Sequence, residues 1–197
     1  MTGFLGLILG CMFSGKTTAL IDIYEQSQKE GKEVCVINYS GDTRYHDSML
    51  STHDKKMIPC SFASRLSEIW VSHVITQIHV ADVILINEGQ FFPDLYEIVY
   101  SMVEEYGKTV YVCGLDGDFN RNKFGQLLDL IPLCDTVKKL RADCHICDNE
   151  GLFSHRITAE KGQVVIGSDN YIPLCRGCYK QGNLRGRGTV GSPAKNK

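Results

Sequence analysis

The amino-acid sequence predicts an α/β fold with a doubly wound parallel sheet, followed by a small cysteine-rich module. Three observations support this prediction. Up to residue 140, short apolar segments alternate with longer segments of helical periodicity, as in consecutive β-α-β units. From Arg141 onwards the chain is rich in cysteine, glycine and short β-like pieces. The last residues are polar and basic without apolar periodicity. We therefore expect domains at 1–140 and 141–182 and a disordered basic tail at 183–197.

The first domain begins with an apolar strand at Phe4–Leu9 and a glycine-bounded loop. A helix-compatible segment follows, from Lys16 to about Glu30. Gly31 interrupts the pattern before a second strand at Val34–Asn38. The polar stretch 39–56 has no sustained period, which predicts a long functional loop.

The next elements continue the alternation. Helical spacing runs through 64–79, and Val83–Ile86 is a continuous apolar run, as expected for a strand buried on both faces of a parallel sheet. Pro93–Tyr106 begins with proline and an acid, which predicts a helix, and Thr109–Cys113 gives another buried strand. In the second module, Gln163–Ile166 is expected to be β-like.

Composition excludes several classes of protein. The chain has 197 residues, of which 43% are hydrophobic and 22% charged, which is ordinary for a globular protein. Lys plus Arg is 21 and Asp plus Glu is 23, so there is no general positive charge to hold a nucleic acid. No apolar run reaches the length of roughly 20 residues that a membrane span needs, and no secretory signal is recognisable. Nine cysteines in such a chain favour reduced thiols or metal ligands, and hence a cytoplasmic location.

The loop after the first strand fits the phosphate-binding motif G-x-x-x-x-G-K-[ST]. Small residues let backbone N–H groups wrap phosphates, Lys16 reaches the β and γ oxygens, and the Thr17 hydroxyl can ligate magnesium. A glycine-rich turn with an incidental lysine is the alternative, which the strand before it and the helix after it disfavour. The expected nucleotide-binding residues here are Gly10, Cys11, Met12, Phe13, Ser14, Gly15, Lys16 and Thr17.

A polar pair, Asn87 and Glu88, follows the strand Val83–Ile86 directly. Because strand carboxyl ends carry the ligand in open α/β sheets, both side chains should face the γ-phosphate. Asn87 offers an oxygen without the charge that an aspartate would bring to magnesium. A carboxylate at Glu88 can take a proton from an attacking hydroxyl or water. The alternative is a solvated acid at the end of a strand.

Two C-x-x-C pairs lie in the second module, with 27 residues between them. Paired knuckles of this kind supply four thiolates to a tetrahedral zinc ion and leave no open position, so the metal would be structural. A redox C-x-x-C or chance buried cysteines are the alternatives. The expected zinc ligands are Cys144, Cys147, Cys175 and Cys178. Zinc would then fix the base of a long loop.

Several classes of nucleotide-binding protein combine a phosphate-binding loop with a zinc ribbon, and the sequence discriminates among them. A guanine nucleotide reader is disfavoured because Asn122–Gly125 lacks the aspartate of the Asn-Lys-x-Asp motif. A nucleic-acid motor would need more length and a basic track. A kinase for a small molecule fits better.

Five motifs, taken together, resemble the zinc-containing (type II) thymidine kinases. They occur in the family's order: Gly10–Thr17, Asp42–Tyr45 with Thr52–Asp54, Glu88–Asp94, Leu115–Phe119, and the two cysteine pairs. The resemblance implies a RecA-like P-loop domain with a C-terminal zinc-ribbon or lasso domain. It also implies transfer of the γ-phosphoryl group of ATP to the 5′-hydroxyl of thymidine or deoxyuridine, giving the monophosphate for nucleotide salvage and DNA synthesis. The family usually has proline at position 11 and aspartate at position 87, where this chain has Cys11 and Asn87.

The resemblance also implies roles for individual residues. Glu88 matches the catalytic base, Lys16 and Arg44 would act on the phosphates, and Asp42, Asn87 and Gln90 would lie on the nucleotide side. Phe119 would flank the thymine ring and Tyr171 would close on it. The nucleoside would be held by Met12, Phe91, Leu115, Ser154, Gln163, Val164, Val165, Ile166 and Gly167, the last five through main-chain groups of the lasso.

Family membership further implies ATP, Mg²⁺ and structural Zn²⁺ as cofactors, a homotetramer, and dTTP as feedback inhibitor. No membrane or nucleic-acid partner is expected. Three other readings stay open at this stage: a deoxynucleoside kinase of altered base preference, a catalytically weak ATP-binding regulator whose lasso binds a protein, and a nucleic-acid binder acting through the tail 185–197.

Overall fold

The structure is a computed structural model that describes residues 2–41, 49–51, 56–70, 79–165 and 167–184. Within these residues no helix is both long and apolar enough to cross a lipid bilayer.

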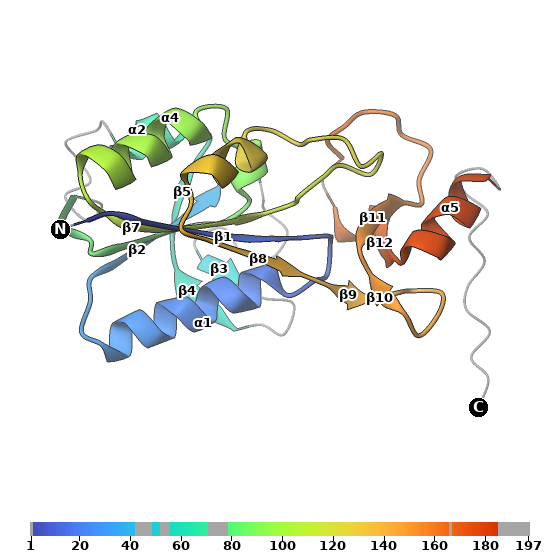
Figure 1. Cartoon of the computed structure of the whole chain (residues 1–197), viewed down its shortest axis with the longest axis horizontal. Coiled ribbons are helices and arrows are strands. Elements are labelled where there is room, and N and C mark those ends of the chain that lie inside the picture. Colours follow the sequence, from blue (N-terminus) through green and yellow to red (C-terminus); the bar gives the residue numbers. More distant parts are fainter. Residues whose placement is uncertain (1, 42–48, 52–55, 71–78, 166, 185–197) are drawn as a thin grey trace.

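The centre of the protein is a six-stranded parallel sheet (Figure 1). The order of its strands across the sheet is β5-β2-β6-β7-β1-β8, and every neighbouring pair is parallel. The strands are β1 (Phe4–Gly10), β2 (Val34–Tyr39), β5 (Ser61–Ala63), β6 (Val83–Ile86), β7 (Thr109–Gly114) and β8 (Thr136–Leu140). Because the strands are parallel, the turns that follow β1, β2, β6 and β7 all lie at one edge of the sheet.

The four predicted strands of this sheet are confirmed, and two further strands were not predicted. β6 is buried along its whole length, which explains its unbroken apolar run. The additional strand β8 lies at the edge beside β1, and its first four residues are exposed. Its sequence therefore lacks the apolar signal by which a buried strand is recognised. The other addition, β5, is a three-residue edge strand.

Helices cover both faces of the sheet (Figure 1), which confirms the doubly wound class. Helix α1 (Lys16–Lys29) packs Leu20 and Ile21 on one face, in a core with Ile8 and Leu85. On the other face lie α2 (Leu66–Trp70), α4 (Leu95–Tyr100) and the 3₁₀ helix η3 (Leu127–Leu133), around a second core.

Two predicted segments differ in detail from the structure. The predicted helix 93–106 is present as α4 followed by a π-helical segment, η2 (Ser101–Glu105). Of the predicted helix 64–79, α2 forms the start, and residues 71–78 lie outside the described residues. The predicted loop 39–56 contains the strand β3 (Met49–Ser51), which pairs antiparallel with β4 (Met57–Pro59).

The cysteine-rich module lies beyond the end of β8, at the right of Figure 1. It consists of two small antiparallel pairs, one short 3₁₀ helix and a final helix. These elements are β9 (Ala142–Asp143), β10 (Glu150–Gly151), β11 (Phe153–Arg156), η4 (Ser168–Asn170), β12 (Tyr171–Leu174) and α5 (Arg176–Leu184). The expectation of a β-like segment at Gln163–Ile166 is wrong for 163–165, which form no strand, and Ile166 lies outside the described residues. Residues 185–197 of the predicted tail are also outside them.

Candidate active site

The phosphate-binding motif forms the turn between β1 and α1, as its pattern predicts. Gly15 has φ +80°, a conformation that L side chains rarely adopt. A Cβ on Gly10 would lie 2.8 Å from the Leu140 carbonyl oxygen, a backbone atom that cannot move aside, so glycine is required there. Helix α1 begins at Lys16, and the unpaired N–H groups of its first turn favour an anion at this end.

Two polar side chains of this loop fit a phosphate ligand. The Ser14 hydroxyl is buried and has no hydrogen-bond partner among the described residues. The Lys16 ammonium group, on a side chain only 8% exposed, donates to the Cys11 carbonyl oxygen at 2.7 Å. Thr17 stands in the first turn of α1, and Phe13 is 47% exposed at the tip of the loop. The loop thus presents a cation, a hydroxyl and a helix N-terminus together.

The phosphate-binding loop is joined directly to the cysteine-rich module. The backbone N–H of Met12 donates to the Ser154 hydroxyl at 2.9 Å, and the Cys11 thiol donates to the Gly151 carbonyl oxygen at 3.4 Å. Burial raises the pKa of Cys11, which keeps the thiol protonated as that donor. The cysteine at position 11 therefore adds a hydrogen bond between the phosphate-binding loop and the cysteine-rich module, which a proline side chain could not donate.

Asn87 directly follows β6 and is 2% exposed. Its amide nitrogen donates to Asn38 Oδ1 at 2.8 Å, and its amide oxygen accepts from the Cys113 thiol at 2.9 Å. Burial raises the pKa of Cys113 to about 12, so the thiol remains a donor. Asn87 therefore links the carboxyl ends of β2, β6 and β7, and both atoms of its amide group already have partners.

Glu88 follows in the left-handed conformation, with φ +55°, and is 9% exposed. Its Oε2 accepts from the Gln90 amide nitrogen at 2.6 Å, while Gln90 Oε1 accepts from the backbone N–H of Leu115 at 3.0 Å. Gln90 thus holds the Glu88 carboxylate against the end of β7. This arrangement fixes the carboxylate within the cavity described next.

A cavity that is open to solvent lies between the ends of the strands and the cysteine-rich module. Glu88 lines it, together with Met12 of the phosphate-binding loop. All the described residues expected to hold a nucleoside also line it: Met12, Phe91, Leu115, Phe119, Ser154, Gln163, Val164, Val165, Gly167 and Tyr171. The cavity therefore brings together residues of the phosphate-binding loop, of the turns that follow β6 and β7, and of the cysteine-rich module.

Some lining residues were not foreseen, and some expected residues are not described. Tyr39, Gly41, Asp118 and Phe124 also line the cavity. Tyr39 stacks on Phe91 with ring centroids 5.0 Å apart, and Phe124 contacts Phe91 edge-on. Asp42, Arg44 and Ile166 lie outside the described residues.

The segment between the cysteine pairs, residues 148–174, forms the outer wall of the cavity; we call it the lasso. The Gln163 side-chain amide donates to Asp118 Oδ2 at 3.0 Å, which ties the lasso to the loop after β7. Arg156 is fully buried, and its guanidinium group lies 3.7 Å from the centroid of the Phe119 ring. No motif in the sequence distinguishes this arginine from the others.

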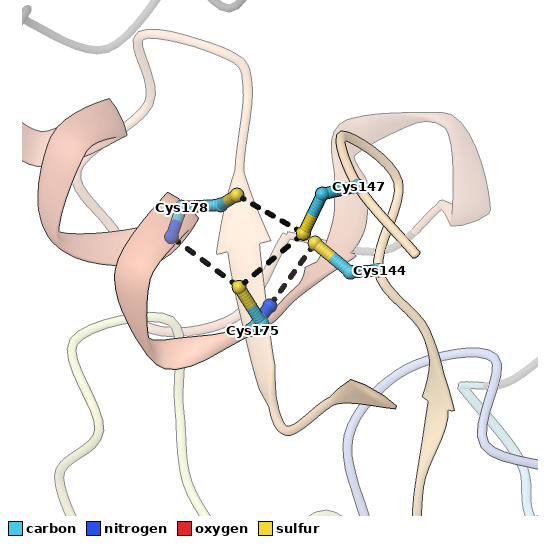
Figure 2. A group of neighbouring side chains, drawn as sticks. All are labelled: Cys144, Cys147, Cys175 and Cys178. Atoms are coloured by element: carbon cyan, nitrogen blue, oxygen red, sulfur yellow. Dashed lines mark hydrogen bonds between the residues drawn. The ribbon is translucent and has the colours of Figure 1, made fainter. Parts of the chain in front are cut away.

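The four cysteine side chains point toward one another (Figure 2), and their sulfur atoms all lie within 4.8 Å of one another. A tetrahedral zinc site with Zn–S bonds of about 2.3 Å places its sulfurs about 3.8 Å apart. The Cys147 sulfur lies 3.7 Å from that of Cys175 and 3.6 Å from that of Cys178. In the part of the chain that the structure describes, this is the one group of His, Cys, Asp or Glu side chains that could hold a metal ion.

Backbone donors also fit a metal thiolate site. The N–H of Cys175 donates to the Cys144 sulfur at 3.2 Å, and the N–H of Cys178 donates to the Cys175 sulfur at 3.4 Å (Figure 2). Burial raises the pKa of Cys144, but the backbone donors outweigh it and lower this pKa to about 7. The cysteines that the pattern selected are thus the cysteines that the fold brings together.

Comparison with known proteins places the chain in one family. A family model described as "Thymidine kinase" matches residues 3–179. The chain is 43% identical over 178 residues to a thymidine kinase of variola virus, covering 90% of this chain and 97% of the viral protein. It is 42% identical to a cytosolic thymidine kinase of Bos taurus (90% and 72% covered) and 40% identical to a thymidine kinase of Oryza sativa subsp. japonica (92% and 68% covered). The chain belongs to the thymidine kinase family.

Proposed function

We propose that this protein transfers the γ-phosphoryl group of ATP to the 5′-hydroxyl of thymidine or deoxyuridine. The observation that carries the proposal is the shared cavity, which Glu88 lines together with Met12 of the phosphate-binding loop and with the aromatic residues Phe119 and Tyr171. A nucleoside held by the lasso side directs its hydroxyl towards the loop where ATP binds. The product, dTMP, feeds DNA synthesis.

In this proposal Glu88 is the catalytic base. A buried carboxylate can take the proton of the 5′-hydroxyl as that oxygen attacks the terminal phosphorus of ATP. Gln90 holds the carboxylate in place for this transfer through the 2.6 Å hydrogen bond. The proton leaves the hydroxyl oxygen for Glu88, while the phosphoryl group leaves ADP for the same oxygen.

The phosphate-binding loop binds the transferring group. Lys16 exchanges its hydrogen bond to the Cys11 carbonyl for one to the β and γ oxygens, and the Ser14 hydroxyl and the first-turn N–H groups of α1 supply further donors. Arg44 is proposed to act on the phosphates, with Asp42, Asn87 and Gln90 on the nucleotide side. Mg²⁺, held through Thr17, supplies positive charge to the phosphate oxygens when it is bound.

The base is bound between aromatic rings. Phe119 flanks it on one side, Tyr171 closes over it, and Met12, Leu115 and Phe91 give an apolar wall for the thymine methyl group. Main-chain groups of residues 163–167 supply hydrogen bonds to the edge of the ring, which have to provide most of the discrimination against cytosine. Zinc on the four cysteines holds the base of the lasso and takes no part in the reaction. We further propose a cytoplasmic homotetramer that dTTP inhibits by occupying the thymidine site.

A panel of nucleosides tests the proposal. Purified full-length protein with ATP and magnesium should phosphorylate thymidine and deoxyuridine, and should leave deoxycytidine and purine nucleosides unphosphorylated. Elemental analysis should find one zinc ion per chain. Phosphorylation of another base in preference to thymine would favour the kinase of altered specificity. ATP binding without transfer to any nucleoside would refute the proposal in favour of a regulator.

A further inference from the structure

We propose that Arg156 is a positioning residue for the nucleoside, because it holds the loop 157–165 of the lasso and two aromatic rings of the cavity in one arrangement. This inference rests on the proposed thymidine site. Arg156 ends β11 and is paired with Tyr171 of β12 in the antiparallel register. It is fully buried and does not appear among the residues that line the cavity, so it acts on the ligand through its neighbours.

The guanidinium group is surrounded by backbone carbonyl oxygens of the lasso. One terminal nitrogen donates to the Glu160 carbonyl at 3.1 Å and to the Gly162 carbonyl. The other donates to the Gln163 carbonyl at 3.0 Å and to the Tyr171 hydroxyl. These partners span the loop 157–165, which forms no strand and so lacks a ladder of its own to fix its path.

The same group also contacts the two rings expected to enclose the base. Its central carbon lies 3.7 Å from the centroid of the Phe119 ring and 5.0 Å from that of Tyr171. A cation at this distance from an aromatic face is attracted to it. The Tyr171 hydroxyl in turn donates to the Val165 carbonyl at 3.2 Å. Arg156 therefore connects Phe119 of the first domain, Tyr171 of β12 and the carbonyls of the loop.

Only arginine suits this position. Burying a charge is costly unless several polar groups compensate it. The planar fork presents five N–H donors in fixed directions, and the four on its two terminal nitrogens serve the four acceptors here, while Nε has no hydrogen-bond partner among the described residues. The ammonium group of a lysine is a compact centre with three donors. Lysine at position 156 would keep the charge but could not reach all four acceptors. We therefore expect even this conservative change to loosen the loop.

The test compares Arg156→Gln and Arg156→Lys with the wild-type full-length, zinc-loaded protein. Arg121 provides the matched control, because its guanidinium group also lies over two rings of the module, Tyr179 at 4.7 Å and Phe153 at 5.3 Å. Unlike Arg156, Arg121 is exposed and makes no hydrogen bond to the described residues of the loop. Two properties are measured: the KM values for thymidine and ATP, and the rate of tryptic cleavage after Lys161, an exposed residue within the loop.

For Arg156→Gln we expect the thymidine KM and the cleavage rate at Lys161 each to rise about tenfold or more, as loss of several hydrogen bonds to a charged group implies. The KM for ATP should change by less than about twofold, and zinc content should be retained. Arg156→Lys should lie between this variant and the wild type, and Arg121→Gln should match the wild type.

Unchanged thymidine KM and cleavage in a zinc-loaded Arg156→Gln would overturn the inference. So would an equal rise in the KM values of both substrates with loss of zinc, because that is the result of general structural damage. If Arg156→Gln does not fold, a wild-type thymidine KM in Arg156→Lys overturns it. The cleavage assay needs no nucleoside, so it still tests the role of Arg156 in the lasso if the wild-type protein phosphorylates no nucleoside and the proposed function fails.

Discussion

Replacing Glu88 by glutamine tests the chemical step by itself. Glutamine has nearly the same shape as glutamate, and its side-chain oxygen can still accept the 2.6 Å hydrogen bond from the Gln90 amide nitrogen. Because glutamine and glutamate have the same branching at Cβ, the substitution adds no backbone strain at φ +55°. The cavity should therefore retain its form and its affinity for both substrates. Only the ability to accept a proton is lost.

The expected loss follows from the role of a general base. Such a group contributes typically about 10² to 10⁴ in rate, which corresponds to about 3–5 kcal/mol of transition-state stabilisation. We expect kcat for thymidine to fall by at least about a hundredfold, with both KM values within about threefold of wild type. Initial rates with labelled thymidine, and calorimetric titration with thymidine alone, measure the two effects separately.

A Glu88→Gln protein with wild-type kcat would remove Glu88 from the role of base. Loss of thymidine binding with kcat unchanged at saturation would instead assign Glu88 to recognition of the nucleoside. The catalytic assignment requires that kcat falls while binding persists.

Three further perturbations test other parts of the structure. Removing zinc with a chelator should raise the thymidine KM, while the far-UV circular dichroism of the sheet persists. The reason is that the metal fixes the lasso and not the parallel strands. Full thymidine affinity in the metal-free protein would contradict this prediction. Asn87→Asp places a carboxylate oxygen 2.8 Å from Asn38 Oδ1, so the thermal stability should fall unless the Asn38 side-chain amide rotates to present its nitrogen. Activity at low magnesium should be kept or raised. A large loss of activity at every magnesium concentration would show that position 87 serves only the hydrogen bonds to Asn38 and Cys113. Asp94 accepts from the N–H groups of Leu66 and Ser67 at 3.0 Å each, and Asp94→Asn should lower the stability at pH 7 by about 1–2 kcal/mol.

The pH dependence of the Asp94 effect follows from its pKa. Burial alone would raise the pKa of Asp94, but hydrogen bonds from the Ser67 side chain and from the backbone N–H groups of Ser67 and Leu66 outweigh it and lower the pKa. The stabilisation is therefore present at neutral pH and is lost as the pH falls below the ordinary aspartate value towards the lowered one. Thermal melts of wild type and Asp94→Asn should converge in that acidic range, and a constant difference between them would contradict the assignment.

Much of the fold could be predicted because its signals are local. The phosphate-binding loop is one continuous motif between a strand and a helix, and the cysteine pairs are set by their spacing. The buried strands β6 and β7 show as apolar runs because both faces of the sheet are covered. The edge strand β8 was missed because its residues face solvent and carry no such run.

The contacts that were missed depend on which elements become neighbours in space. Asn38 and Cys113 are partners of Asn87 only because β2, β6 and β7 are adjacent and parallel. The loop 163–165 resembled a strand in its apolar residues, yet the Gln163 carbonyl accepts from Arg156 and the Val165 carbonyl accepts from the Tyr171 hydroxyl, instead of pairing in a ladder. A single arginine gives no sign in the sequence that it is buried.

The cysteine-rich module lines the cavity of the proposed active site. Among the described residues, four hydrogen bonds cross between it and the first domain: Met12 to Ser154, Cys11 to Gly151, Gln163 to Asp118, and the Tyr179 hydroxyl to the Phe119 carbonyl oxygen at 2.7 Å. Two of them reach the phosphate-binding loop and two reach the loop that carries Phe119. The module's own apolar core is small, centred on Ile172, Leu174 and Tyr179, so we expect a metal ion on the four cysteines to supply much of its rigidity. Zinc on the four cysteines would therefore control, through the lasso, how the nucleoside faces the bound phosphates, although it lies outside the cavity.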